Sequence, residues 1–263
     1  MRCAFLDMDN TLVKTGYREY LVGVPAKYLA DKMSIEHEKA VSLLRSKVRE
    51  IMREKIVSGD YLMAFDWDYI IPEALKEFGV EIKGFDALSL LLSAVDGGAT
   101  YVYEDTIEAI EEMRKQYIIC IITGGLSRYQ DAILDKLGIR GLFDYVLTTD
   151  RLGYLKVRPE AFWEAMRICG CTKAFHVGDS LSHDVGGGKA AGLPVLLMAR
   201  RWSWLRPYDP FQRVTIAMRE GILQEEMSKD ILYGYIPEEL MIPDAIVIDM
   251  SEVPPLARDL EKN

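Results

Sequence analysis

Short apolar runs and helix-like stretches alternate along most of the chain. Strand-sized apolar runs occur at residues 3–6, 117–122, 145–148, 174–177, 194–198 and 245–248. Helix-like stretches accompany them at about residues 105–116, 129–137, 159–168 and 184–191. Strands that are apolar throughout are typical of a parallel sheet that is covered on both faces. The repeated order of helix and strand therefore predicts an α/β fold, a doubly wound parallel sheet with helices on both faces.

The segment between about residues 14 and 99 has a different, helical period. Apolar side chains recur there at spacings of three and four, while Glu and Lys fill the opposite face. The clearest series is Ile35, Val41, Leu44, Val48, Ile51 and Met52. Further helical stretches follow at about residues 61–78 and 86–94, and Asp96-Gly97-Gly98 then breaks the pattern. The pattern predicts an all-helical segment inserted shortly after the first strand.

Composition narrows the class of protein. The 263 residues carry 32 Lys and Arg against 41 Asp and Glu, a net charge of −9, and 49% of them are apolar. That apolar fraction suffices for a buried core and excludes wholesale disorder. No apolar run approaches the roughly 18 residues of a membrane span, and Asp7 and Asp9 interrupt the N-terminal apolar stretch, so we expect neither membrane association nor a signal peptide. The acidic balance argues against nucleic acid as a partner.

The four cysteines resemble neither a disulfide framework nor a zinc site. Cys3 and Cys120 lie inside strand-like runs, where a thiol is usually a small buried hydrophobic group. Cys169-Gly-Cys171 lacks a second pair of ligands at zinc spacing. We therefore expect free thiols in a reducing, cytoplasmic setting. The chain contains only two Asn and four Gln, which indicates a thermophilic source.

Polar clusters follow the ends of four predicted strands or stand before the next helix. They are Asp7/Asp9/Thr11, Thr123, Lys156 and Asp179/Asp184. Parallel strands bring such clusters to one edge of the sheet, where ligands bind. Four carboxylates in one pocket need positive charge, which Lys156 and a divalent cation would supply; carboxylate oxygens suit Mg²⁺. An ionised Asp beside a phosphate can attack phosphorus, and a second carboxylate two residues on can transfer protons.

At these residues the chain resembles the haloacid dehalogenase superfamily of phosphohydrolases. Four motifs of that family occur in order: Asp7-Met8-Asp9-Asn10-Thr11, the strand-ending Thr123, Lys156 ahead of a helix that begins with Pro159, and Gly178-Asp179 with Asp184. The resemblance covers about residues 1–14 and 100–200 and the last strand. It implies a Rossmann-like core of residues 1–14 and 100–263, with a long insertion at 200–243, and a helical cap domain at 15–99.

The resemblance also implies a role for each motif residue. Asp7 would be the nucleophile, Asp9 the general acid and base, and Lys156 the cation that neutralises charge on the nucleophile and the phosphate. The phosphoryl oxygens would be held by Thr11, Thr123 and Gly124. A Mg²⁺ ion would be held by Asp7, Asp9 through its backbone carbonyl, Asp179 and Asp184.

The expected function is magnesium-dependent hydrolysis of a small phosphate monoester through an aspartyl-phosphate. A phosphomutase or phosphotransferase would keep every one of these residues. A 2-haloacid dehalogenase would use the same nucleophile without a metal ion, and it has no need of Asp9. A non-catalytic scaffold would not need the full set of catalytic residues. The partner would be a small phosphorylated metabolite, and the protein a monomer or a homodimer. The natural substrate is not readable from the motifs.

Three further patterns have simpler interpretations. Residues 200–211 alternate basic and aromatic side chains, which can stack bases or pack on the core with the Arg stems alongside; packing or a dimer contact is favoured. Gly186-Gly187-Gly188-Lys189 lacks the spacing of a phosphate-binding loop and falls in a predicted helix. His176 lies within a predicted strand, and we expect it to be a hydrogen-bonded core residue.

Overall fold

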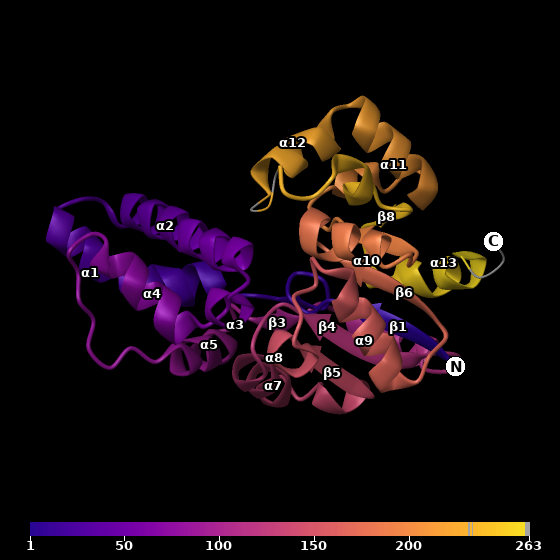
Figure 1. Ribbon diagram of the computed structural model, residues 1–263, viewed down its shortest axis with the longest axis horizontal. Helices are drawn as coiled ribbons and strands as arrows, with labels where there is room; N and C mark the ends of the chain where they lie inside the picture. The colour runs from indigo at the N-terminus through magenta and orange to yellow at the C-terminus, as the bar shows by residue number, and fades with distance from the viewer. Residues whose placement is uncertain (231, 233, 261–263) are drawn as a thin grey trace. The chain divides into compact units, whose positions relative to one another are not determined.

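The computed structural model describes residues 1–230, 232 and 234–260 and divides into two compact units (Figure 1). The first unit consists of Met1–Val13, Val102–Gly124 and the described residues of Arg140–Asn263. The second unit consists of Lys14–Tyr101 and Gly125–Ile139. Where the chain passes between them, β2 (Val13–Lys14) and β3 (Tyr101–Val102) form a two-stranded sheet.

The first unit contains a six-stranded parallel sheet in the order β5-β4-β1-β6-β7-β8. Its strands are β1 (Arg2–Leu6), β4 (Ile118–Thr123), β5 (Tyr145–Thr148), β6 (Lys173–Gly178), β7 (Val195–Met198) and β8 (Ala245–Val247). All six coincide with predicted apolar runs, and most of their residues are buried. The chain order reverses on either side of β1, as in doubly wound sheets. The predicted fold class is confirmed.

Helices connect and flank these strands. They are α6 (Thr106–Met113), α8 (Thr149–Leu152), α9 (Pro159–Cys169), α10 (Gly187–Ala190), α11 (Pro210–Arg219), α12 (Ile222–Lys229) and α13 (Val253–Leu260). Short turns of helix lie at η2 (Arg140–Leu142), η3 (Leu181–Gly186), η4 (Ser203–Leu205), η5 (Glu238–Met241) and η6 (Met250–Glu252). On one face of the sheet, Phe162 of α9 packs in an apolar cluster with Phe5 of β1 and Ile122 of β4. The helix expected at residues 184–191 is divided into η3 and α10.

The insertion at 200–243 packs on the edge of the sheet. Trp202 and Leu205 are buried in one apolar cluster with Val195 and Leu197 of β7, and α11 packs against β8 (Figure 1). The Arg200 guanidinium lies 3.8 Å from the centroid of the Tyr103 ring. These contacts agree with the packing interpretation of the basic and aromatic pattern, although Trp204 and Tyr208 are exposed.

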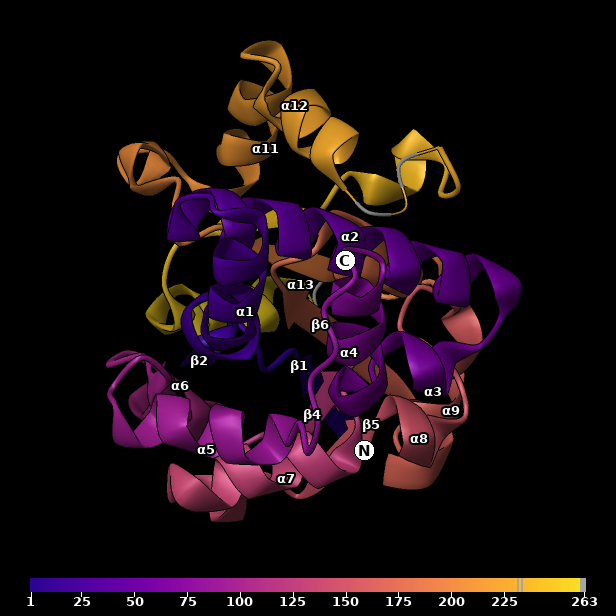
Figure 2. The same ribbon diagram turned by 90° about the vertical axis from the view of Figure 1, so that its left-hand side faces the viewer.

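The second unit is helical. Its elements are η1 (Tyr17–Val22), α1 (Gly23–Met33), α2 (His37–Ser58), α3 (Tyr61–Ala64), α4 (Trp67–Lys76), α5 (Ala87–Asp96) and α7 (Ser127–Lys136). Figure 2 shows α2 alongside α1 and α4, and Val41, Leu44 and Val48 form part of the buried face of α2.

The membership of α7 in the second unit differs from the expected domain boundary, which assigned all of residues 100–263 to the core. α7 packs against α5 of the second unit, and two residues at its N-terminus add bonds to α4. The Tyr129 hydroxyl donates a hydrogen bond of 2.7 Å to Asp68, and Arg128 forms an ion pair with Asp66. These bonds join α7 to the start of α4, about sixty positions earlier, so local periodicity alone does not reveal them.

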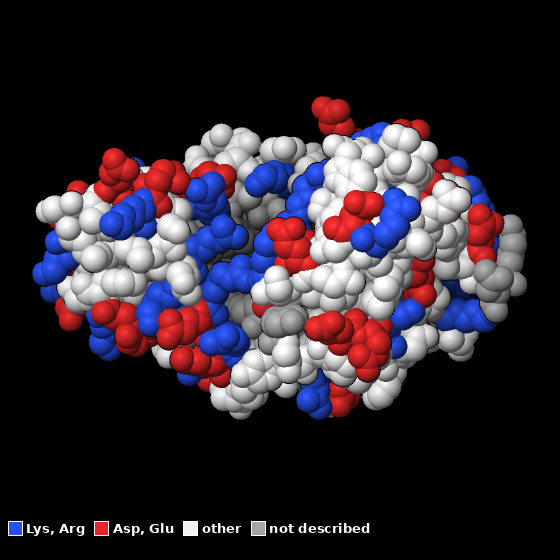
Figure 3. All heavy atoms as spheres, turned by 90° about the horizontal axis from the view of Figure 1, so that it is seen from above, with Lys and Arg blue, Asp and Glu red and all other residues white. Residues whose placement is uncertain are grey.

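Both basic side chains (blue) and acidic side chains (red) are exposed on the face seen in Figure 3. Among the described residues, no helix combines the length and the apolar character that crossing a membrane requires.

Candidate active site

The register of the sheet aligns the candidate residues at the carboxyl ends of its central strands. Leu6 of β1 pairs with Ile121 of β4 and with Val177 of β6. Asp7 follows β1 directly, and its backbone N–H donates to the Val177 carbonyl at 2.8 Å. Thr123 is the last residue of β4, and Asp179 comes directly after β6. Asp7, Thr123 and Asp179 therefore share one edge of the sheet.

The loop after β1 turns back on itself and supports Asp7. Asn10 has a φ angle of +59°, a left-handed conformation that Asn tolerates better than most residues. Its N–H donates to the Val13 carbonyl at 2.7 Å, which closes the loop. The buried Thr11 hydroxyl donates to Asp7 Oδ2 at 3.2 Å. Thr11, predicted to bind phosphate, thus contacts the proposed nucleophile, while Asp9 is half-buried in the same loop.

Lys156 lies between two buried carboxylates. Its Nζ forms ion pairs with Asp7 Oδ1 and, at 2.6 Å, with Asp184 Oδ1, and all three side chains are nearly inaccessible to solvent. The turn that carries Lys156 is closed by a 2.8 Å hydrogen bond from the Arg158 N–H to the Leu155 carbonyl. Pro159, at the first position of α9, favours the start of a helix at that point. The structure therefore brings together three residues that are separated by up to 177 positions.

Asp184 is held from three sides. Lys156 contacts Oδ1, His176 Nε2 lies 2.7 Å from the same oxygen, and the Ser180 N–H donates to Oδ2 at 3.0 Å. A Cβ atom at Gly178 would lie 2.2 Å from Asp184 Cγ, so the carboxylate occupies space that a larger residue would fill. These contacts fix the orientation of Asp184, which in turn holds the Lys156 ammonium beside Asp7.

The charges in this cluster are unevenly compensated. Burial, opposed by Lys156 and reinforced by the Asp184 and Asp179 carboxylates, raises the pKa of Asp7 well above its ordinary value. Burial and the neighbouring Asp184 carboxylate likewise raise the pKa of Asp179 to about 7. Although burial acts in the opposite direction, Lys156 and His176 hold the pKa of Asp184 below its ordinary range. Lys156 and His176 therefore stabilise the ionised form of Asp184, whereas ionisation of Asp7 and Asp179 stays unfavourable in this cluster.

The carboxylates form a set that can hold a cation. One oxygen from each of Asp7, Asp179 and Asp184 lies within 4.8 Å of the others. Hard oxygen donors of this kind suit Mg²⁺, which takes a few carboxylates and completes its coordination with water. The raised pKa values of Asp7 and Asp179 indicate the excess negative charge that a divalent cation would neutralise. The residues present therefore fit a magnesium ion.

Thr123 and Gly124 lie next to this cluster in the sheet. Thr123 is buried and pairs with Thr148 of β5. The Gly124 carbonyl accepts a 2.9 Å hydrogen bond from the Thr149 hydroxyl, which anchors the end of β4 to the start of α8. The register puts both residues at the same edge as Asp7, which agrees with the expected position of a phosphate site, and their binding of phosphate stays a prediction.

The glycine cluster at residues 186–188 allows η3 and α10 to approach the site. A Cβ atom at Gly187 would lie 1.7 Å from the Lys156 carbonyl oxygen, and one at Gly188 would lie 2.6 Å from a Val195 methyl group. Gly187 thus permits close contact between α10 and the turn that carries Lys156. This packing role accounts for the glycines without a phosphate-binding loop.

We expect Gly187→Ala to lower the free energy of unfolding by about 3 kcal/mol or more, because the added methyl group meets a backbone atom that cannot rotate away. Urea unfolding monitored by circular dichroism measures the change. Gly141→Ala is the matched control, since an added Cβ there meets nothing within 4 Å, and we expect a change within about 0.5 kcal/mol. Equal stability of the two variants would contradict the packing role.

Sequence reasoning missed the functional position of His176. The residue is fully buried and hydrogen-bonded, as expected, but its partner on one side is the site carboxylate Asp184, and the Phe5 carbonyl lies 3.1 Å from the other ring nitrogen. The sequence feature that indicates this role is the position of His176 on β6, two residues before Gly178. In a parallel strand, a polar side chain so close to the carboxyl end can reach the site.

Comparison with known proteins identifies the family of the chain. The family haloacid dehalogenase-like hydrolase matches residues 1–192. The chain therefore belongs to the haloacid dehalogenase-like hydrolases. This confirms the family identification that the four motifs supported, and with it the prediction that the protein is an enzyme.

Three individual proteins illustrate how similar this chain is to its relatives. The chain is 27% identical over 204 residues to the glyceraldehyde 3-phosphate phosphatase of Methanothermobacter thermautotrophicus, a match that covers 75% of this chain and 85% of that protein. It resembles the crystal structure of a phosphatase of this family from Thermococcus onnurineus, with a TM-score of 0.58, 28% identity, and 76% and 87% of the two chains covered. The L-2-haloacid dehalogenase of Xanthobacter autotrophicus has a TM-score of 0.65 at 19% identity, covering 97% and 98%, and shows the shared fold alone.

Proposed function

We propose that the protein is a magnesium-dependent phosphatase that hydrolyses a small phosphate monoester through an aspartyl-phosphate on Asp7. The observation that carries the proposal is the ion-paired cluster of Asp7, Lys156 and Asp184, with Asp179 beside it at the carboxyl edge of the sheet. The two phosphatases among the relatives support the same reaction class.

The first chemical step is the attack of an Asp7 carboxylate oxygen on phosphorus. A bond forms between this oxygen and phosphorus, and the bond from phosphorus to the leaving oxygen breaks. Asp9, two residues on, donates a proton to the leaving oxygen, which departs as an alcohol. Lys156 offsets negative charge on Asp7 and on the phosphoryl oxygens, while Thr11, Thr123 and Gly124 position those oxygens.

The second step returns the enzyme to its starting state. Asp9, now ionised, accepts a proton from water as the water oxygen attacks phosphorus. The bond from phosphorus to Asp7 breaks, inorganic phosphate leaves, and the Asp7 carboxylate is regenerated. Asp184 and His176 keep Lys156 directed at Asp7 through both steps, because their contacts fix the orientation of the ammonium group.

Asp7, Asp179 and Asp184, together with the backbone carbonyl of Asp9, are the groups that would hold magnesium. When bound, the ion would reduce the repulsion between the carboxylates and the anionic substrate. The raised pKa values of Asp7 and Asp179 support this assignment from the chain's own residues.

The substrate class follows from the reaction and the relatives. A glyceraldehyde 3-phosphate phosphatase among them supports a small phosphorylated metabolite. The helical segment predicted as a cap, residues 15–99, is the part of the chain that we propose to select among such metabolites.

We expect the affinity for Mg²⁺ to fall by at least about tenfold for each pH unit below 7, because Asp179, whose pKa is about 7, must lose a proton to bind the ion. The raised pKa of Asp7 would make this fall steeper. Isothermal titration calorimetry at pH 6 and pH 8 measures the difference. Asp179→Asn should weaken binding at pH 8 and flatten the dependence on pH. An affinity that is equal at both pH values would contradict the proposed ligand set.

The direct test of the function is release of phosphate from p-nitrophenyl phosphate with magnesium and with EDTA. We expect turnover only with magnesium. Two further assays test the alternative activities: an added alcohol acceptor detects phosphoryl transfer, and 2-chloropropionate detects dehalogenation by chloride release. A panel of sugar phosphates and phosphoglycolate ranks the substrates. Absence of phosphate release from every ester, with the protein folded at the assay temperature, would contradict the phosphatase proposal.

A further inference from the structure

The four cysteines of the chain, which lie up to 168 positions apart, meet in one apolar core of the first unit. Cys3 lies on β1, Cys120 lies on β4, and Cys169 is the last residue of α9, followed closely by Cys171. All four are buried free thiols and belong to the same cluster of packed side chains. Sequence spacing excluded a zinc motif but did not reveal this convergence.

Two of the sulfur atoms are especially close. Cys120 Sγ and Cys169 Sγ lie 3.1 Å apart, and the Cys3 sulfur lies within 4.8 Å of both. Because β4 and α9 are packed elements of one core, this proximity is maintained by the fold and not by a mobile loop. A small displacement of either side chain would bring the two sulfur atoms to the bond length of a disulfide, about 2.05 Å.

We propose that Cys120 and Cys169 form a reversible disulfide when the folded protein meets a peroxide. This site is separate from the proposed phosphatase chemistry and does not depend on it.

The reaction with hydrogen peroxide balances in two steps. The Cys169 thiolate attacks one peroxide oxygen, the O–O bond breaks, and a sulfenic acid and water result once a proton is taken up. The Cys120 sulfur then attacks the Cys169 sulfur, the S–O bond breaks, and the thiol proton leaves with the departing oxygen as a second water. Hydrogen bonds from the Cys120 and Cys3 thiols lower the pKa of Cys169, which makes it the attacking group.

The apolar surroundings favour a disulfide over a bound metal ion. Phe5, Ile122 and Phe162 belong to the cluster around the cysteines. Three thiolates with one divalent cation would leave a net negative charge in that environment, which costs solvation energy, whereas a disulfide is uncharged. Sulfur ligands of a tetrahedral zinc ion at about 2.3 Å lie about 3.8 Å apart, and the 3.1 Å separation of Cys120 and Cys169 is shorter.

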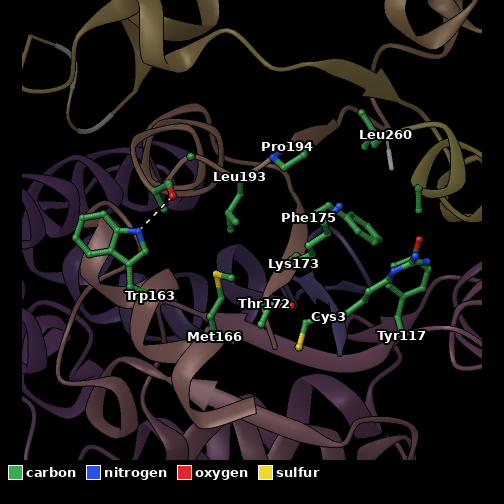
Figure 4. Close-up of a pocket in the computed structure, with 15 residues that line it drawn as sticks. Cys3, Tyr117, Trp163, Met166, Thr172, Lys173, Phe175, Leu193, Pro194 and Leu260 are labelled. Carbon is green, nitrogen blue, oxygen red and sulfur yellow. Dashed lines mark hydrogen bonds between the residues drawn. The ribbon is translucent and has the colours of Figure 1, made fainter. Parts of the chain in front are cut away.

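A cavity reaches the cluster at Cys3. It measures about 470 Å³, and Cys3, Met166 and Thr172 are among the residues that line it (Figure 4). Cys3 and Thr172 lie close to the amino ends of β1 and β6, opposite the edge that carries Asp7. A small oxidant can therefore reach Cys3, whose sulfur lies within 4.8 Å of the Cys120 and Cys169 sulfur atoms, without passing through the candidate active site.

The disulfide would join β4 to the end of α9 and close a loop of about fifty residues. Such a link restricts the unfolded chain, so the oxidised protein should melt about 5–15 °C above the reduced protein, with reversal by a phosphine reductant. The experiment is treatment of the full chain with a small excess of hydrogen peroxide, then intact mass, differential scanning calorimetry and non-reducing peptide mapping.

We expect the loss of two hydrogen atoms and a cross-link between the tryptic peptides 116–128 and 168–173. Since Cys169 and Cys171 share the second peptide, Cys171→Ser is the matched control and should still form the link. Cys169→Ala and Cys120→Ala should not form it. If a variant fails to fold, fragmentation of the cross-linked wild-type peptide distinguishes Cys169 from Cys171.

Several results would overturn the proposal. They are a link that persists in Cys169→Ala through Cys171, a link from Cys3 in place of Cys120, sulfinic or sulfonic acid without any disulfide, and no reaction of the folded protein. Stoichiometric binding of Zn²⁺ by the reduced protein, with protection of the cysteines from alkylation, would instead assign the cluster to a metal.

Discussion

Asp7→Asn should lower kcat for p-nitrophenyl phosphate by at least about 10⁴-fold, because an amide oxygen cannot replace the carboxylate as the nucleophile that bonds to phosphorus. The side chain keeps its shape. The single amide oxygen can still accept from the Lys156 ammonium, and the Thr11 hydroxyl, which bonds the other oxygen of Asp7, can turn to accept from the amide NH2. One negative charge leaves the buried cluster, in which the pKa of Asp7 is already raised by burial. Folding should therefore be preserved. Steady-state kinetics in magnesium buffer and a thermal melt measure the two effects.

The matched control for that substitution is Asp31→Asn, an identical chemical change at an exposed position of α1. We expect it to leave kcat unchanged. Turnover by Asp7→Asn within tenfold of the wild type would exclude Asp7 as nucleophile, whereas loss of activity together with loss of the melting transition would show only that the variant does not fold.

Lys156→Met should reduce both stability and activity, because it removes the positive charge from between two buried carboxylates while keeping most of the side-chain volume. Breaking a buried ion pair from one side costs about 3–5 kcal/mol, which urea unfolding in metal-free buffer would measure. We expect kcat to fall by about 10²–10⁴-fold, the range for a lost group that stabilises charge in the transition state.

A double variant separates these two losses. Lys156→Met combined with Asp184→Asn no longer leaves Asp184 as an unpaired buried charge, so it should recover much of the stability and little of the activity. If the double variant were as unstable as the single one, Lys156 would act through packing and not through its charge. If Lys156→Met retained full activity, the cation would have no part in the reaction.

Much of the first unit could be predicted because its signals are local. Each buried strand is a continuous apolar run, and the polar residues that follow Leu6 and Gly178 mark the strand ends. In a parallel sheet such ends share an edge, so the sequence alone sufficed to assign Asp7, Asp179 and Thr123 to one region. Lys156 was identified by Pro159, which marks the start of the next helix.

Other features depend on contacts between residues far apart in the chain. The assignment of α7 to the helical unit rests on its packing against α5 and on side-chain bonds to α4. The bond from His176 to Asp184 requires a strand and the following turn to be placed in three dimensions. No periodicity encodes such pairings.

The cysteines and the glycine cluster also depend on contacts between residues far apart in the chain. Cys120 and Cys169 each look like an ordinary core residue, and only the packing of β4 against α9 makes them a pair. The residue spacing argued against a phosphate loop at Gly187 but gave no role for this glycine, which the close approach of the Lys156 carbonyl explains. In both cases the determining quantity is a distance between elements, which residue spacing along the chain does not contain.

The most direct measurement of the central claim is mass spectrometry of Asp9→Asn after acid quenching during reaction with p-nitrophenyl phosphate. p-Nitrophenolate leaves without a proton, so attack by Asp7 should proceed, whereas the water that breaks the intermediate has lost its general base. We predict one added phosphoryl group on the tryptic peptide 3–14, removable by hydroxylamine as an acyl phosphate is. A burst of p-nitrophenolate with no phosphoryl group on this peptide, or with one that resists hydroxylamine, would contradict an aspartyl-phosphate on Asp7.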